Sequence, residues 1–331
     1  NICCEELFLK LMKEYDIKNI VKQLCKKKEK LFIRNCKLID IVILYHGREL
    51  LRDIIIDRLG TDNKLIYIST GKYILELIRT NKKNNLVKKI LDVVHEYIND
   101  TDYKYCLIEA CRYNEKIAKY ILESNWCSQE LVNKVNENGD NCLINACINS
   151  PEIALYILKS KWCNQKLVNQ VNKNGNNCLT NGYINFPEIT KYILESKWCN
   201  QKLVNQVTKD GHNCLIIACY HSNKSAKYIL KSKWFKQELI NQVTSFHKNN
   251  CLMSACKFNP EVAQYILESK WCNPKLLEQL NVEGDNYLMF AVRHFSLTKY
   301  ILESKWCSQK LVNQVNKYGI NCLLQSTRFD L

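Results

Sequence analysis

The chain has 331 residues, a mass of 38.9 kDa and a formal net charge of +15 at pH 7. Its apolar fraction of 47% and charged fraction of 24% exclude a wholly disordered protein. Nine glycines and four prolines are too few for the turns of a sandwich or a barrel, which argues against an all-β fold. A chain of this length exceeds one ordinary hydrophobic core, so it either divides into domains or is built from repeats.

Residues 1–99 are predicted to form a divergent helical N-terminal region. Helices are expected over residues 5–27 and 49–58, and residues 72–76 repeat the pattern of residues 119–123. We interpret the region as degenerate repeats with a cap that shields the core of a repeat array from water, and an independent domain is the alternative. The apolar stretch at 38–45 is short and carries an aspartate, so no membrane-spanning segment is expected.

Residues 100–331 are dominated by internal repeats. The six tryptophans are spaced by 36, 36, 36, 37 and 35 residues, and they are Trp126, Trp162, Trp198, Trp234, Trp271 and Trp306. The ten residues from Trp162 are identical to the ten from Trp198. A fixed period of this kind predicts six stacked repeats and a partial seventh, with a core that runs from unit to unit.

Each repeat is predicted to contain a pair of helices. Apolar residues within 142–147 form one stripe of a short helix, and those within 153–158 form a broader stripe on the next. Between the two stripes, Ser150 is expected to cap the second helix and Pro151 to begin it, and Asn259 repeats the cap.

A short third helix is expected after each tryptophan. In the second repeat Asn164 is placed to cap it, and apolar residues within 167–171 share one face. The unit then closes on a turn in which a glycine such as Gly175 supplies a positive φ, whereas the fifth repeat has His247 and Lys248 instead. The predicted fold class is therefore an all-α repeat solenoid.

This unit resembles the ankyrin repeat, in which a glycine turn leads to T-P-L-x-x-A and then to a second helix rich in Ile, Val and Leu. Six residues of the second repeat match that pattern, namely Gly139, Leu143, Ala146, Ile153, Ile157 and Leu158. Three features depart from it: Asn141 and Cys142 stand where the family has Thr-Pro, the period is 36 rather than about 33, and the third helix replaces the β-hairpin finger. The near-identical units, rich in Asn, Lys and Ile, are similar to the expanded ankyrin-type proteins of large DNA viruses of amoebae, which would place the chain in the host cytoplasm.

The nineteen cysteines are interpreted as buried free thiols in a reducing compartment. They contain no C-x-x-C pair, and most recur once per repeat beside apolar residues. Zinc binding is the alternative, but the six histidines are scattered and never pair with cysteines at ligand spacing. We therefore expect no metal and no cofactor.

The positive charge is interpreted as spread along the chain. The first 100 residues have 20 basic and 14 acidic side chains (+6), and the rest have 28 and 19 (+9). A nucleic-acid partner is therefore a less favoured expectation than a protein partner.

No pattern in the sequence calls for catalysis. Paired acids with a base, a Cys-His nucleophile and a phosphate-binding glycine loop are all absent from the pattern, so we do not expect an enzyme. The repeated tryptophans are either binding anchors or packing groups, and their strict spacing favours packing between repeats. The leading hypothesis is a scaffold that binds a partner protein on its concave face, the alternatives being a self-associating structural protein and a salt-sensitive nucleic-acid binder.

Binding residues are expected where otherwise similar repeats differ, because packing does not dictate those side chains; drift without constraint is the alternative. If the ankyrin resemblance holds, these positions lie on the first helices and the turn tips. These are the surfaces through which that family binds protein partners. The candidates are Asn145, Asn181, Ile217, Ser254, Arg112, Ile148, Tyr220, Lys257, Asn138, Asn174, Asp210 and His212.

Overall fold

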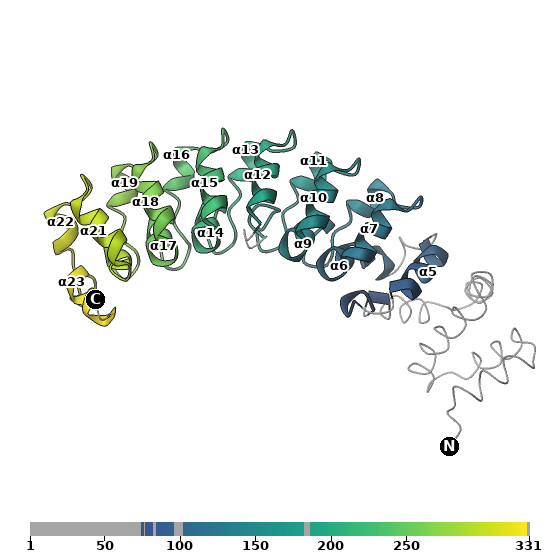
Figure 1. The fold of residues 1–331 in the computed structure, drawn as a ribbon, viewed down its shortest axis with the longest axis horizontal. Coiled ribbons are helices and arrows are strands. Elements are labelled where there is room, and N and C mark those ends of the chain that lie inside the picture. The colour runs from purple at the N-terminus through teal and green to yellow at the C-terminus, as the bar shows by residue number, and fades with distance from the viewer. Residues whose placement is uncertain (1–73, 76, 82–83, 96–101, 182–185, 330–331) are drawn as a thin grey trace, which may run out of the picture. The chain divides into compact units, whose positions relative to one another are not determined.

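The computed structural model describes residues 74–75, 77–81, 84–95, 102–181 and 186–329 (Figure 1). The helices expected over residues 5–27 and 49–58 lie outside these ranges. The chain divides into two compact units, residues 1–131 and 132–331, and each is described by itself. Every element in the described part is a helix, apart from one isolated antiparallel bridge between Val243 and Asn250.

The described part of the first unit consists of a pair of helices, α6 and α7, and the helical segments that flank the pair. Its elements are α5 (Asn84–Val94), η2 (Asp102–Tyr105), α6 (Cys106–Tyr113), α7 (Glu115–Glu123) and α8 (Gln129–Val132), which ends one residue beyond the unit. Asn114 caps α7 by accepting the Ile117 N–H, and its amide donates to the Asn84 side chain at 2.8 Å. Arg79 Nε donates to Glu109 Oε2, also at 2.8 Å. These bonds tie α5 and its preceding turn to the pair.

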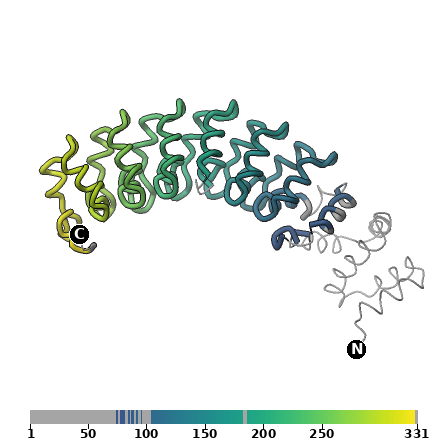
Figure 2. The backbone as a smooth tube through the Cα atoms, in the orientation of Figure 1, coloured from purple at the N-terminus to yellow at the C-terminus, as the bar shows by residue number. Residues whose placement is uncertain are grey.

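The second unit repeats one pattern of two longer helices and a short third one (Figure 2). Its helices are α9 (Cys142–Asn149), α10 (Pro151–Lys159), α11 (Gln165–Val168), α12 (Pro187–Glu195), α13 (Gln201–Val204), α14 (Cys214–His221), α15 (Asn223–Lys231), α16 (Gln237–Ile240), α17 (Cys251–Phe258), α18 (Pro260–Glu268), α19 (Pro274–Leu277), α20 (Tyr287–Ala291), α21 (Phe295–Glu303), α22 (Gln309–Asn313), α23 (Cys322–Ser326) and η3 (Thr327–Phe329). The predicted solenoid with a short third helix is confirmed.

Within the second unit, the helices of one kind form rows. The first helices α9, α14 and α17 lie along one edge of the unit, and the short helices α11, α13, α16 and α19 lie along the opposite edge (Figure 1). The unit bends gently, so that the first helices are on its inner side. Most apolar side chains between the rows are fully buried, which makes one core that continues through successive repeats.

The third repeat departs from the predicted helix pair. Residues 178–181 form a turn and a bend rather than the start of a helix. The Thr180 hydroxyl accepts the Asn177 N–H at 2.8 Å and donates to the Asn177 side chain at 3.2 Å. Such local side-chain bonds compete with the helix ladder, and Gly182 follows directly in the sequence. The other repeats have Ile, Met or Leu in place of Thr180 and form the helix.

An asparagine makes two structural bonds at once at the start of each of the first helices α9, α14, α17 and α20. Asn141 Oδ1 accepts the Ile144 N–H at 2.8 Å, which caps α9, and Asn141 Nδ2 donates at 2.7 Å to the carbonyl of Leu167 in α11. The amide therefore closes the unit by tying its first helix to its third. The equivalent pairs are Asn177–Leu203, Asn213–Leu239, Asn250–Leu276 and Asn286–Leu311, all at 2.8 Å.

The second helices are capped differently from the sequence prediction. Ser150 and Asn259 occupy the cap position and a proline follows each, as expected, but neither side chain makes a capping hydrogen bond. Ser222, which no proline follows, does cap its helix by accepting the Ser225 N–H at 3.3 Å. Asn164 caps the third helix α11 as predicted, accepting the Leu167 N–H at 2.8 Å. Where proline is present, its fixed φ is the remaining start signal.

The tryptophans lie between repeats, which confirms the packing interpretation over the binding anchor. Trp234 Nε1 donates to the Leu194 carbonyl of the preceding repeat at 3.1 Å, and the Trp234 carbonyl accepts from Gln201 Nε2 of that same repeat at 2.8 Å. The same indole bond joins Trp271 to Leu230 and Trp306 to Leu267. The tryptophan rings are half-buried rather than fully buried, so they join adjacent repeats at the edge of the core.

We predict that Asn213→Ala destabilises the fold by about 2 to 4 kcal/mol, because it removes a helix cap and leaves the buried Leu239 carbonyl without its donor. Asn321 caps α23 in the same way, through the Leu324 N–H, and makes no equivalent bond to a third helix within the described residues. The control Asn321→Ala should therefore cost only about 1 kcal/mol. Equal losses in urea denaturation would show that the second bond adds nothing.

Candidate functional site

Two of the residues predicted to bind a partner are buried within the repeats. Asn145 is 1% exposed and Ser254 is 2% exposed, and the Ser254 hydroxyl donates to the Asn250 carbonyl at 3.0 Å. Both point into the stack of first helices rather than to solvent. In this structure they offer no surface to a partner.

The other candidates reach the surface to different degrees. Ile148, Ile217, Tyr220 and Lys257 are half-buried near the middles and ends of the first helices. At the turn tips Asn138, Asn174 and Asp210 are exposed, and His212 is half-buried. Asn181 is half-buried next to residues that the structure does not describe. Arg112 belongs to the first unit, where its guanidinium lies 5.2 Å from the centroid of the Tyr113 ring.

Tyr220 is the centre of a cluster of rings at the ends of α14 and α17. Its ring centroid lies 4.8 Å from that of Phe258, 5.9 Å from that of His212 and 6.1 Å from that of His221. Phe258 is 48% exposed, and Lys257 Nζ lies 4.9 Å from the centroid of the Phe258 ring. We call His212, Tyr220, His221 and Phe258 the aromatic patch. It is formed where the fourth and fifth repeats meet.

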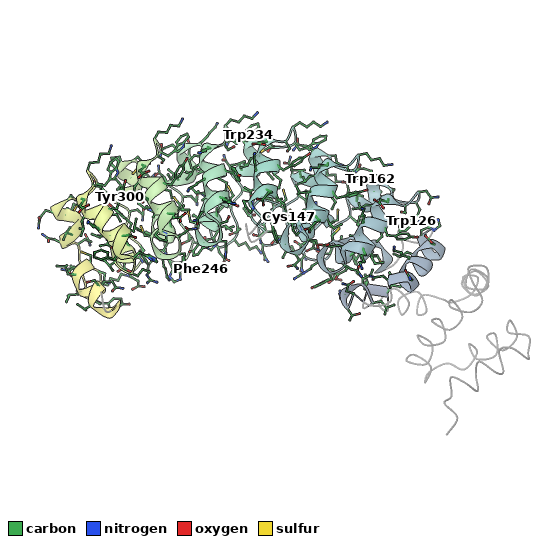
Figure 3. All side chains as sticks on the ribbon, viewed as in Figure 1. Trp126, Cys147, Trp162, Trp234, Phe246 and Tyr300 are labelled. Carbon is green, nitrogen blue, oxygen red and sulfur yellow. The ribbon has the colours of Figure 1, made fainter. Side chains whose placement is uncertain are left out.

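A fifth ring extends the patch at the tip of the next turn. Phe246 is 73% exposed, and Figure 3 places it on the edge of the unit where α14 and α17 lie. The Ser245 N–H beside it donates to the Asp210 carbonyl at 2.8 Å, and the Ser245 hydroxyl donates to the Lys209 carbonyl at 3.2 Å. The tip that carries Phe246 is therefore fastened to the tip that precedes His212.

The tips of the second unit are joined by a regular backbone contact. A backbone N–H of each tip donates to a carbonyl of the preceding one at 2.8 to 2.9 Å, the pairs being Lys173–Asn138, Lys209–Asn174, Ser245–Asp210, Val282–His247 and Lys317–Glu283. The tip glycines have positive φ, as predicted, and Lys248 takes φ +57° in the fifth repeat. The tips thus form a continuous row from which Phe246 projects.

Sequence reasoning did not single out Phe246 or Phe258. Phe246 lies in the turn that contains the extra residue of the 37-residue step, which was a detectable signal. Phe258 is the last residue of α17, and the equivalent residues of α9 and α14 are Asn149 and His221. A comparison of this position between repeats would therefore have identified Phe258. Only the fold shows that Phe258 lies beside Tyr220, and that the tip carrying Phe246 is bonded to the tip that precedes His212.

The aromatic patch is uncharged at neutral pH. Burial lowers the pKa of His212, although Asp210 opposes the shift, and burial also lowers the pKa of His221. Both imidazoles are neutral at pH 7, and each presents an apolar ring face, one N–H donor and one acceptor nitrogen. The surface combines aromatic area with a few hydrogen-bonding groups, which is the composition typical of protein interfaces.

The cysteines of the described residues are packing groups. Thirteen of these fifteen free thiols are buried, which confirms that interpretation, and the other two are half-buried. Burial raises the pKa of Cys147, Cys199 and Cys214 to about 12. Within the part of the chain that the structure describes, no group of three His, Cys, Asp or Glu side chains is placed to hold a metal ion.

These features define a helical repeat solenoid with an exposed aromatic patch on its first helices. Residues 177–274 match the family model for ankyrin repeats (3 copies), which identifies this segment as ankyrin repeats. Such repeats are generally protein-protein interaction modules and are typically non-catalytic. None of the helices that the structure describes is long and apolar enough to span a membrane.

Two further comparisons were made. No curated protein matches this chain. Among solved structures, a chain from the complex of the Bd0816 predatory endopeptidase of Bdellovibrio bacteriovorus with immunity protein Bd3460 is 18% identical, with a TM-score of 0.37. The match covers 68% of this chain and 91% of that chain.

We predict that Gly211→Ala destabilises the fold more than Gly319→Ala, by about 1 to 3 kcal/mol. Both glycines have positive φ, so both variants bear the same backbone cost of about 1 kcal/mol. A Cβ at Gly211 would lie 2.5 Å from the Ser245 nitrogen, whereas one at Gly319 meets nothing within 4 Å. Thermal unfolding of the two variants measures the difference. Equal losses of stability in the two variants would show that the close contact between Gly211 and Ser245 does not stabilise the fold.

Proposed function

We propose that the chain is a non-catalytic scaffold that binds a partner protein through the aromatic patch and the turn tip that carries Phe246. The observation that carries the proposal is the exposure of two rings: Phe258, which contacts Tyr220 at the end of α17, and Phe246, in the turn tip bonded to the tip before His212. Packing within the repeats does not require either ring at the surface. Exposed apolar clusters of this kind mark interaction sites, and aromatic anchors carry much of the affinity of protein interfaces.

The surroundings of the patch support a protein partner. The tips beside the patch are joined to one another by backbone hydrogen bonds. The turn that carries Phe246 is therefore already ordered, and binding costs little conformational entropy there. The two neutral histidines add hydrogen-bonding groups, and Lys257 adds a charge at the rim. We extend the same surface to Ile148, Ile217 and the exposed tips of the second unit, where the repeats differ from one another.

We also infer where this interaction takes place. Fifteen free thiols among the described residues are compatible with a reducing compartment, and we propose the cytoplasm. The partner is expected to present a surface that accepts two phenylalanine rings, since no other large apolar ring of the fourth and fifth repeats is as exposed as these.

We predict that the double variant Phe246→Ala and Phe258→Ala loses partner capture by about tenfold or more, because both changes remove exposed anchors. The experiment is affinity capture from native cells with nuclease present, with the retained proteins quantified for each bait. The matched control is Phe295→Ala, which removes a ring that is 71% exposed outside the patch.

A protein retained by the wild type and the control, and lost by the double variant, is the expected result. All three baits should unfold within about 0.5 kcal/mol of one another, because each change is at the surface. A protein retained equally by all three, or lost equally with Phe295→Ala, would place the binding site elsewhere.

A further inference from the structure

The positive charge of the second unit is concentrated in three of its repeats. Residues 159–236 contain thirteen lysines, no arginine and three acidic residues, which gives a net charge of 13 − 3 = +10. Residues 237–315 have the same architecture but contain eight basic and seven acidic residues, a net charge of 8 − 7 = +1. The interpretation of an evenly spread charge, which rested on a division at residue 100, is therefore wrong for the repeats.

Lysines of this segment are ordered from one repeat to the next. Lys159 in α10 places its Nζ 5.6 Å from the centroid of the Tyr192 ring in α12. Lys191 lies in the same way 5.9 Å from Tyr228, and Lys227 lies 5.7 Å from Tyr265. Each contact links the second helix of one repeat to that of the next, because the cation is attracted to the face of the ring.

A second row of lysines runs beside the first. Lys161, Lys197 and Lys233 each precede a tryptophan, and their Nζ atoms lie 4.5, 4.6 and 4.9 Å from the centroids of the Trp162, Trp198 and Trp234 rings. Figure 3 places Trp162 and Trp234 along the edge opposite Phe246. We call the lysines of residues 159–236 that have an ordered ring contact the lysine strip, namely Lys159, Lys161, Lys191, Lys197, Lys227, Lys231 and Lys233. Lys270 and Lys305 repeat the tryptophan contact in the fifth and sixth repeats, where acidic residues nearly balance the basic ones.

The charges of the strip are not neutralised within the fold. Among the residues that the structure describes, no strip lysine lies within 4.0 Å of a carboxylate oxygen. Lys299 in the sixth repeat, by contrast, pairs with Glu303 at 3.9 Å. Six of the seven strip lysines are exposed, the exception being the half-buried Lys227. The ammonium groups therefore keep N–H donors available to an anion from solvent.

We propose that the lysine strip binds the phosphate backbone of a double-stranded nucleic acid, without reading its sequence. Lysine is a compact point charge that contacts phosphates from many directions, and residues 159–236 contain no arginine, whose rigid planar fork is suited to reading guanine with two fixed bonds. The ring faces are covered by ammonium groups, so they offer no platform on which unpaired bases stack. A linear array of charges complements the regular charge of a duplex.

An acidic peptide fits this surface less well. The strip consists of second helices and the turns after them, whose backbone groups are largely paired within the helices. It therefore offers no free strand edge to which an extended peptide could add. A duplex requires only charge and a surface without a groove. This binding is independent of the aromatic patch, which lies on the opposite edge.

The test is the binding of a fluorescent DNA duplex of about 24 base pairs, measured by anisotropy between about 50 and 200 mM KCl. The strip variant carries Lys191→Gln, Lys197→Gln, Lys227→Gln and Lys233→Gln. The control variant removes the same number of charges from exposed lysines of the fifth and sixth repeats, through Lys248→Gln, Lys275→Gln, Lys299→Gln and Lys310→Gln. Circular dichroism checks that both variants remain folded.

We expect the strip variant to bind at least about tenfold more weakly at low salt and to lower the slope of log K against log salt by about 3 to 4. The control variant should lower that slope by less than about 1. A matching RNA duplex should bind with a similar slope, since both present phosphates. Equal losses of affinity in the two variants would show that only the net charge matters, and would overturn the proposal. Absence of duplex binding by the wild type would also overturn it. Displacement of the duplex by polyglutamate of equal charge would overturn it too, because the strip would then be a site for acidic protein segments.

Discussion

The amide of the capping asparagine is the contact on which the second unit depends. One side chain supplies an acceptor to the start of the first helix and a donor to the third helix, and Asn141 and its equivalents are almost completely buried. A four-residue helix such as α11 cannot persist by itself in water. Because Asn141 holds the Leu167 carbonyl, the short helix is fixed against the first helix of its repeat. The tryptophan that precedes the short helix and the tip that follows it are thereby positioned.

The repeats are joined to one another by different groups from those that close each repeat. The Trp234 indole and the Gln201 side chain bond across one boundary, and the tips bond across it again through their backbones. These contacts recur with little change, so they leave few exposed side chains free to vary. The variation collects at the ends of the first helices and at their tips, which form the proposed protein-binding surface. The lysine strip is different, because the lysine before the tryptophan recurs from the second repeat to the sixth, and the local net charge is what sets residues 159–236 apart.

Much of the fold followed from the sequence because the signals are local and repeated. The tryptophan spacing defined the unit, the apolar stripes defined the helix pair, and Asn164 and Gly175 were correctly read as a cap and a turn. The role of Asn141 did not follow, since its bond to Leu167 joins residues 26 positions apart. The turn at Thr180 was not predicted either, because the bond of a single hydroxyl replaces the expected start of a helix by a turn.

The candidate site was less predictable than the fold. Asn145 and Ser254 differ between repeats, which suggested exposure, but an eight-residue helix packed on both sides buries them. Phe246 and Phe258 belong to one surface only because the tips and the first helices stack in register, which no single repeat displays. The lysine strip likewise depends on contacts between repeats, such as Lys191 with Tyr228.

The central claim is that repeated positions hold the fold while the aromatic patch and Phe246 on the adjoining tip contact the partner. The most direct measurement replaces Phe246 with a photo-crosslinking phenylalanine analogue, and in a second protein replaces Phe295, which is equally exposed. After irradiation in native cells, the account predicts a covalent adduct with one protein from position 246 and no such adduct from position 295. An adduct from position 295 alone, or none from position 246 while the partner is still captured, would contradict it.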